Sequence, residues 1–478
     1  MSQIMRRYVG RRETMAFGIA NGGQTFGFGL VVNFLNYFYI NIFRVDPKIV
    51  ALLLFLAGIW DIVNNPLMGV IIDKTRTRCG KLQPFLRAGI LPQAAATCLL
   101  FAGPFFFPNA SPTAPSKVLY MFVTYFVWEL CYTVTDVSFW GLSAALSPNP
   151  DDRARAITST SLFSTIIGSL PYIIVLLLMD AAALPGSRVK MTTVFLALGL
   201  IAGTVGMGVF SLAAVFVRER LQQSEERPNF RESLSQIVTN KPLRLILTAN
   251  LIWSLCSVGY VFAIYYYTDV LGWASIGLLT EIPGAVLGFV SYAFVPFLRK
   301  RMDSRKTMLL VQISASIAQM LVFAVGIRHY ENAAVMVPML MLFISFITLF
   351  TGVMSVVPGE MMAQATDYSE WKTGKRSEGI SFSMRIVTTK INGTISQSIG
   401  ALALAAIGYV PGGSGVRAPQ PQPVRFRIFS MFILLPAVIR LLGTIPYFFY
   451  DLVGEKRDAM LRELTERRKA AMEERNNG

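Results

Sequence analysis

Apolar stretches of about 20 residues, the length that an α-helix needs to cross a membrane, recur from one end of the chain to the other. Hydrophobic residues make up 53% of the sequence and charged residues 15%, whereas a soluble domain carries about 25% charged residues. The pattern predicts an all-α membrane protein with twelve transmembrane helices. The predicted spans are 15–42, 49–72, 88–107, 118–146, 157–179, 192–217, 244–271, 274–298, 307–328, 334–365, 379–409 and 428–449.

The lysines and arginines gather in alternate connections between these spans. The basic segments are 6–12, 74–87, 153–155, 218–244, 299–306 and 372–376, together with the C-terminal tail. Because cytoplasmic loops carry an excess of Lys and Arg, we expect both termini to be cytoplasmic, in a multi-pass protein of the plasma (inner) membrane. Basic loops that face anionic lipid also account for the net charge of +16, so no nucleic-acid partner is needed.

The longest connection falls in the middle of the chain and predicts two halves of six helices each. The expected division is an N-terminal half at 1–217, a central cytoplasmic loop at 218–243, a C-terminal half at 244–450 and a charged, solvated tail helix at 451–478. A weak internal repeat supports the division, because helix ends rich in aromatic residues occur at 36–41 and 265–269. Two such halves are typical of the major facilitator fold, whose substrate site lies between them near the bilayer midplane.

Ionisable residues inside the predicted spans are candidates for function, because a charge in the bilayer costs several kcal/mol. Asp61 and Asn65 are four residues apart and share a helix face, and Glu129 and Asp136 share another. A carboxylate in a low-dielectric cavity can take up a proton or ligate a hard cation. Such coupling is the interpretation that we favour for Asp61, Asp136 and Lys390.

Other intramembrane charges leave two interpretations open. Glu129, Glu281 and Arg385 fit a functional role or a structural ion pair equally well, and Arg440 is expected to reach toward the inner interface with a structural role. The single histidine, His329, falls in an outer loop, so a carboxylate rather than a histidine must carry any proton at the midplane.

Aromatic and acidic side chains on the fourth span suit a sugar. Tyr132 lies one turn before Asp136, and Trp140 lies one turn after it. A ring can stack on the apolar face of a sugar while a carboxylate accepts from its hydroxyls. None of the GxSxG, P-loop, HExxH or CxxC motifs is present. The sequence therefore indicates no enzyme and no cofactor, and an ion gradient must drive any pumping.

Several motifs in order along nearly the whole chain resemble the glycoside–pentoside–hexuronide:cation symporters of the major facilitator superfamily. The quoted segments are WDIVNNPLMG at 60–69, DKTR at 73–76 with GK at 80–81 and PF at 84–85, YTVTD at 132–136 with FW at 139–140, and DYSEW at 367–371 with GKR at 374–376. Lys390 follows the last motif at the family's spacing. The resemblance implies uptake of a sugar or glycoside driven by Na⁺, H⁺ or Li⁺ through alternating access.

The resemblance also implies roles for individual residues. The implied cation-coupling group consists of Asp61, Asn65, Thr133 and Lys390. Asp61 is the carboxylate that would bind Na⁺ or a proton. The implied or inferred substrate contacts are Tyr132, Asp136, Trp140, Gln24, Thr25 and Arg385. Loop residues that match cytoplasmic gating ion pairs are Asp73, Arg153, Arg155, Asp367, Glu370 and Arg376.

Three departures from the family pattern bear on ion and solute. Asn65 stands where the melibiose permease of this family has a second carboxylate, and an amide can ligate a cation but cannot carry a proton. Gln24 and Thr25 replace a sugar-binding Lys–Asp pair, and Phe163 replaces an arginine of the sugar site. We therefore expect a solute other than melibiose.

The hypothesis from the sequence is a symporter of a sugar, glycoside or uronide, coupled to H⁺ or Na⁺ through Asp61. The alternatives are an uncoupled facilitator and a carrier of a more apolar, lipid-like or drug-like solute. We expect the chain to act as a monomer, with the lipid bilayer and a small solute as its partners.

Overall fold

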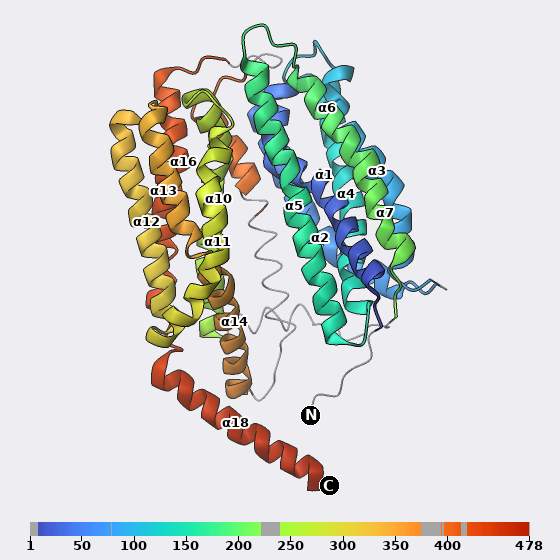
Figure 1. Ribbon diagram of the computed structural model, residues 1–478, viewed down its shortest axis with the longest axis vertical. Coiled ribbons are helices and arrows are strands. Elements are labelled where there is room, and N and C mark those ends of the chain that lie inside the picture. The colour runs from blue at the N-terminus through green and yellow to red at the C-terminus, as the bar shows by residue number, and fades with distance from the viewer. Residues whose placement is uncertain are drawn as a thin grey trace. The chain divides into compact units, whose positions relative to one another are not determined.

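The computed structural model describes residues 8–77, 79–220, 240–373, 393, 396–412 and 418–477. Within these ranges every regular element is helical, and ten helices are long and apolar enough to cross a membrane. An eleventh candidate is bent by 52° between Ile276–Gly288 and Val290–Arg301. The predicted span 379–409 lies largely outside the described residues, but its last part contains the apolar helix Ser396–Ala406. The predicted all-helical membrane protein is confirmed (Figure 1).

The chain forms two compact units. The first comprises residues 1–226 and 397–420, and the second comprises residues 227–396 and 421–478. The helices of the first unit are α1 (Arg11–Tyr37), η1 (Phe38–Ile42), α2 (Pro47–Lys74), α3 (Gln83–Phe106), α4 (Pro115–Ala145), α5 (Pro150–Ala183), α6 (Met191–Ile201), η2 (Ala202–Gly206) and α7 (Met207–Phe216).

Within the first unit, α1 packs along α5 and α7, and α2 and α3 both pack on α4 (Figure 1). A close approach of backbones fixes the α1–α5 contact. A Cβ atom on Gly29 would lie only 2.6 Å from the carbonyl oxygen of Gly168, so the absence of a side chain lets the two helices meet. Small residues commonly play this part between membrane helices.

Proline and short polar residues set where these helices begin. Asp46 caps α2 by accepting from the backbone N–H of Lys48 at 2.8 Å, and Asn149 caps α5 by accepting from that of Asp151 at 2.9 Å. A proline follows each cap at the first helical position, where its missing N–H costs nothing. Each helix therefore starts two to seven residues before the apolar run that predicted it.

The second unit repeats one detail of the first. Its helices are α9 (Lys241–Ser254), α10 (Cys256–Tyr265), η3 (Tyr266–Val270), α11 (Ile276–Arg301), α12 (Ser304–His329), α13 (Ala333–Thr348), α14 (Thr351–Thr373), α16 (Gln422–Leu442), α17 (Ile445–Phe448) and α18 (Gly454–Asn477). The first span of each unit ends in a π-helical turn, η1 at Phe38–Ile42 and η3 at Tyr266–Val270. These turns coincide with the aromatic segments of the weak sequence repeat.

One expectation for the second unit is wrong. The tail helix α18 is not solvated all round, because Met460 and Leu464 are buried against the end of α14. These two apolar residues are four apart in an otherwise charged sequence and so share one face of the helix. Arg440, for which a structural role was expected, is buried on α16 beside Cys256 of α10.

Candidate functional site

Asp61 lies in the middle of α2 and is 9% exposed. The side-chain amide of Asn65, one turn further along, donates to the Asp61 carboxylate and also to the Asp61 backbone carbonyl oxygen at 2.8 Å. The two residues predicted to share a face are therefore joined directly. The amide nitrogen of Asn65 holds the carboxylate in place, and the charge of the pair stays on Asp61.

A polar face of α4 is turned toward Asp61. Tyr125, Glu129, Tyr132, Thr133 and Asp136 fall within about 100° of the helix circumference at 100° per residue. The Tyr125 hydroxyl is hydrogen-bonded to Glu129, and the Tyr132 hydroxyl donates to Asp136 Oδ1 at 3.4 Å. Both tyrosines also lie within electrostatic range of Asp61. Since α2 packs on α4, this face and the Asp61–Asn65 pair border the same part of the first unit.

Thr133 contributes an oxygen atom that has no partner within the described ranges. Its side chain is 2% exposed, and no hydrogen bond to Oγ1 occurs there. A buried polar atom left in this way costs about 1–3 kcal/mol. A hydroxyl oxygen beside a carboxylate is the kind of ligand that a hard cation takes, so the residues present suit a bound alkali cation.

The predicted substrate residues of α4 lie on the same face. Asp136 and Tyr132 are half-buried, and Trp140 is 43% exposed with its ring edge-on to Phe139 at 5.7 Å. The Tyr132 ring is stacked between Phe28 of α1 at 5.0 Å and another α4 ring at 5.3 Å. The acid, the phenol and the exposed indole thus form one surface that could hold a sugar.

The two α1 candidates make contacts between helices. Gln24 is buried and donates through Nε2 to Thr135 Oγ1 at 3.2 Å, and Thr135 in turn donates to Gln93 of α3. Thr25 donates to the backbone oxygen of Asn21 at 2.8 Å and packs near Gly168 of α5. Both side chains therefore join α1 to its neighbours.

Four of the predicted site residues fall wholly or partly outside the described part of the chain. Lys390, Arg385 and Arg376 lie outside the described residues, and the side chain of Asp73 also lies outside them. Asp367 and Glu370 are half-buried near the end of α14.

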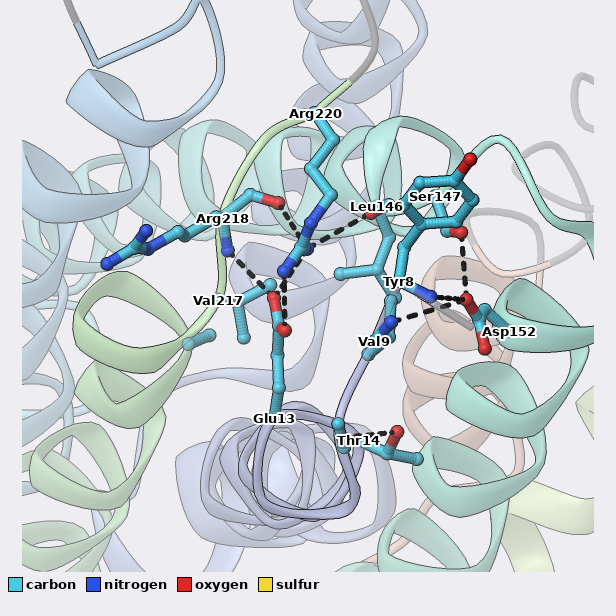
Figure 2. Close-up of polar contacts among 12 residues, drawn as sticks. Tyr8, Val9, Glu13, Thr14, Leu146, Ser147, Asp152, Val217, Arg218 and Arg220 are labelled. Carbon is cyan, nitrogen blue, oxygen red and sulfur yellow. Dashed lines mark hydrogen bonds and ion pairs between the residues drawn. The ribbon is translucent and has the colours of Figure 1, made fainter. Parts of the chain in front are cut away.

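At one end of the first unit, the chain segment before α1 is held by Asp152 (Figure 2). The Asp152 carboxylate accepts from the backbone N–H groups of Tyr8 at 2.9 Å and Val9 at 3.2 Å, and from the Ser147 hydroxyl at 3.0 Å. Arg155 forms an ion pair with the same carboxylate. Of the predicted gating arginines, Arg155 is thus engaged within α5, and Arg153 is half-buried.

A second ion pair, between Arg220 and Glu13, lies at the same end of the first unit. Arg220 donates to both carboxylate oxygens of Glu13 at 2.8 Å and to the Leu146 carbonyl oxygen at 3.1 Å (Figure 2). The backbone N–H of Arg218 also donates to Glu13 at 3.1 Å. The hydrogen bonds that Arg220 donates to Glu13 raise the pKa of the Arg220 guanidinium above its ordinary value. The segment after α7 is therefore joined to α1 and to the end of α4.

A family model described as MFS/sugar transport protein matches residues 16–454, which is most of the chain. The chain belongs to this family. It is a transporter of the glycoside–pentoside–hexuronide:cation symporter family in the major facilitator superfamily, and not an enzyme. The resemblance found in the sequence motifs is confirmed.

Two curated relatives extend over most of the transporter. It is 27% identical over 413 residues to the isoprimeverose transporter of Lactiplantibacillus pentosus, which covers 86% of this chain and 83% of that protein. It is 24% identical over 471 residues to the glucuronide carrier protein homolog of Escherichia coli strain K12, with 97% and 98% covered. The solved structure of a bacterial homologue of the iron transporter ferroportin matches at a TM-score of 0.62 and 16% identity, covering 92% of this chain and 98% of that one. This last likeness shows the fold alone.

Two buried polar residues of the first unit, Asn64 and Asp152, were not singled out from the sequence. Asn64 is 1% exposed, and its Nδ2 atom has no hydrogen-bond partner among the residues that the structure describes. The available signal for Asn64 was its place next to Asn65, in the same polar turn as Asp61. Asp152 was missed because an acid at a helix start is ordinarily explained as a capping residue.

Proposed function

We propose that the chain is a secondary active symporter that carries a sugar, glycoside or uronide together with H⁺ or Na⁺ by alternating access. The observation that carries the proposal is the Asp61–Asn65 pair on α2, which packs on α4, together with the buried Thr133 hydroxyl of α4, which has no hydrogen-bond partner among the described residues. A charge held at mid-span is costly, so its presence there supports a role in transport. An ion that binds this pair can lower that cost and make solute movement depend on the ion gradient.

Each residue has a defined part in the proposed coupling site. Asp61 supplies the negative charge, Asn65 holds its carboxylate in position, and Thr133 supplies a neutral oxygen ligand. Lys390 is proposed to lie beside this site and to replace the cation as a counter-charge when the site empties. A Lys ammonium suits this part because it is a single compact charge.

The solute is proposed to bind on the α4 face. Trp140 stacks on the apolar face of a sugar ring, while Asp136 and Tyr132 exchange hydrogen bonds with its hydroxyls. The proposed α1 contacts, Gln24 and Thr25, act at least in part through packing, since both already bond within the first unit. Arg385 remains proposed for a uronide carboxylate. The isoprimeverose and glucuronide cargo named for the two relatives supports a glycoside or uronide.

The proposal includes the membrane topology and the inner gate. The basic loops favour the plasma (inner) membrane with both termini in the cytoplasm, and one chain suffices for function. The proposed gating residues are Asp73, Arg153, Arg155, Asp367, Glu370 and Arg376. Arg155 supports this role, because it lies at the same end of the first unit as the basic loop segments.

Uptake into proteoliposomes by Asp61→Asn tests the coupling. We expect loss of accumulation against a gradient, with counterflow exchange retained, because the site can still reorient without its ion. The matched control is Asp46→Asn, which removes one charge from the start of the same helix and leaves a residue that caps equally well. Accumulation that survives Asp61→Asn contradicts the proposal and favours an uncoupled facilitator.

A thermal-shift screen over glycosides, pentosides and uronides tests the solute class, because a ligand that binds the folded state raises its apparent stability. A sugar that shifts the melting temperature of the wild type, but not that of Asp136→Asn, supports the proposal. Shifts by lysolipids or steroids alone contradict it and favour the apolar carrier.

A further inference from the structure

Arg440 of α16 is a buried charge with no acid beside it. The residue is 5% exposed, and no carboxylate forms an ion pair with it in the ranges that the structure describes. Cys256 of α10 is hydrogen-bonded to the guanidinium, but a thiol does not balance its charge. The Arg440 Nε atom has no hydrogen-bond partner among the described residues. Since charges buried in proteins are normally paired, this guanidinium needs an anion beside it.

Two polar side chains of α12 are also buried without a partner. Ser316 and Gln319 are 0% and 2% exposed, and neither Ser316 Oγ nor Gln319 Oε1 has a hydrogen-bond partner within the described part of the chain. Buried polar atoms of this kind are rare in folded proteins, and a bound water or ion is a common reason for them. These two side chains therefore indicate a ligand independently of Arg440.

All three side chains lie on the sides of α12 and α16 that face each other. At 100° per residue, Ser316 and Gln319 lie within about 40° of Phe323 around α12. The Phe323 ring stacks on the ring of Phe429 of α16, with 5.4 Å between the ring centroids. Arg440 lies within about 20° of Phe429 around α16. The contact between the two rings thus marks the facing sides, and the polar residues share them.

The register of the two helices places Arg440 and Ser316 at nearly the same level. The helices pack on each other in opposite directions, and the Phe429 ring lies against Gly326. Eleven residues back along α12 from Gly326 lies Ala315, the neighbour of Ser316. Eleven residues forward along α16 from Phe429 lies Arg440.

A second contact, nearer the start of α12, gives the same register. Nη1 of Arg305 donates to the Tyr450 carbonyl oxygen at 3.4 Å. Arg305 is ten residues from Ala315, and Tyr450 is ten residues from Arg440. Side chains on a helix lean toward its N-terminus, so the guanidinium reaches from Arg440 toward the level of Gln319. The three unpartnered atoms therefore converge on one place between the helices.

The chemistry of these groups selects an anion. The Arg440 Nε–H and the Ser316 hydroxyl can both donate, and the Gln319 amide can turn its NH₂ group toward the same point. A water would satisfy the hydrogen bonds but would leave the charge unbalanced, and the guanidinium repels a cation. Because all three residues are almost fully buried, a small inorganic ion fits better than a lipid phosphate, which needs an open path to the surface.

We propose that the second unit binds a chloride ion between α12 and α16, held by Arg440, Ser316 and Gln319. The ion balances the guanidinium and joins the two helices. On the side of α10, Cys256 donates to the Pro436 carbonyl oxygen at 3.5 Å and positions the guanidinium. The inference does not rest on the coupling proposed at Asp61, which concerns the first unit.

Thermal unfolding of the purified protein in NaCl and in sodium gluconate tests the site, because Na⁺ and ionic strength are equal and the anion differs. A ligand of the folded state raises its apparent stability, so chloride, and bromide in its place, should raise the melting temperature of the wild type in a saturable way. Arg440→Gln should lose this shift. Ser316→Ala should raise the half-saturating chloride concentration by about tenfold or more, since a hydrogen bond to a charged group is lost.

Ser314→Ala is the matched control on the same helix. The Ser314 hydroxyl donates to the Val311 carbonyl oxygen at 3.1 Å, so its loss should leave the half-saturating chloride concentration unchanged.

Four results would overturn the chloride site. The first is a wild type that melts at the same temperature in both salts, and the second is a chloride shift that Arg440→Gln and Ser316→Ala both retain. The third is a shift produced by phosphatidylglycerol and not by chloride, which would assign Arg440 to a lipid headgroup. If Arg440→Gln does not fold, an unchanged half-saturating chloride concentration in Ser316→Ala is the fourth.

Discussion

Asn65 donates its side-chain amide to Asp61 twice, once to the carboxylate and once to the backbone carbonyl oxygen at 2.8 Å. A hydrogen bond to a charged group contributes about 1.5–3 kcal/mol. We predict that Asn65→Ala weakens cation binding by about tenfold or more, measured as the cation concentration that gives half-maximal solute uptake, because 1.4 kcal/mol is a factor of ten. Asn33→Ala is the matched control, since it removes an amide that makes the same bond to its own helix on α1. An unchanged cation dependence in Asn65→Ala would show that the amide does not position Asp61.

Thr133→Val separates a ligand from a packing residue. Valine removes, at nearly constant volume, an oxygen that has no partner among the residues described. Without the coupling cation the variant should be more stable than wild type by up to about 1–3 kcal/mol, because a buried unsatisfied group is gone. With the cation it should gain less stability than wild type does. Thr160→Val should destabilise under both conditions, since that hydroxyl is bonded to the Ala156 carbonyl oxygen at 2.9 Å. Equal cation stabilisation of Thr133→Val and wild type contradicts a ligand role.

Trp140 is predicted to bind the solute by stacking. A stacked aromatic ring adds about 0.5–1.5 kcal/mol beyond buried area, so Trp140→Ala should raise the KM for a sugar several-fold, while Trp140→Phe should restore much of the loss. Trp273→Ala is the control, because that indole is similarly exposed but lies just before α11. A KM that Trp140→Ala leaves unchanged would remove this residue from the solute site.

The contact of α18 with the rest of the second unit is predicted to weaken in acid. The Trp371 indole N–H donates to Glu463 at 2.7 Å, and this bond together with Arg467 lowers the pKa of the Glu463 carboxyl. Burial raises the pKa of Asp451, but hydrogen bonds from Lys456 and Lys241 outweigh it and leave that pKa below its ordinary value. Both groups therefore stabilise the contact fully above about pH 5, where the free carboxyls are also ionised, and this contribution is lost as the pH falls through their lowered pKa values.

A spin label at Arg462, which is exposed on α18, measures this change by its mobility in electron paramagnetic resonance spectra. We expect a mobile label in acid, and at neutral pH a label more mobile in Glu463→Gln than in wild type. The same mobility at pH 7 and pH 3 in the wild type would show that the carboxylates do not hold the helix.

Hydropathy alone predicted the helices well, because a helix that crosses lipid must be apolar along most of its length and therefore stands out in the sequence. It placed their starts too late, as at α5, because Asn149, Pro150 and the acids that follow are polar and still helical. Hydropathy also did not predict the 52° bend in α11. The bend lies at a local break near Gly288, and a hydropathy average over the whole span does not detect such a break.

The polar site was only partly predictable for a different reason. Helical spacing on one element is visible in the sequence, so the Asp61–Asn65 pair and the α4 face were expected correctly. Contacts between helices depend on their rotation and depth. The bond from Gln24 to Thr135 could therefore not be derived from spacing alone.

The central claim is that solute and cation move together through Asp61, and solute-driven cation uptake measures this most directly. Sugar is added to proteoliposomes without an ion gradient, and the cation that enters is followed with a Na⁺ or pH electrode. We predict that the wild type takes up cation as the sugar flows inward, and that Asp61→Asn moves sugar without any cation. Cation uptake by Asp61→Asn that equals that of the wild type, or a wild type that moves sugar with no cation, would contradict the account.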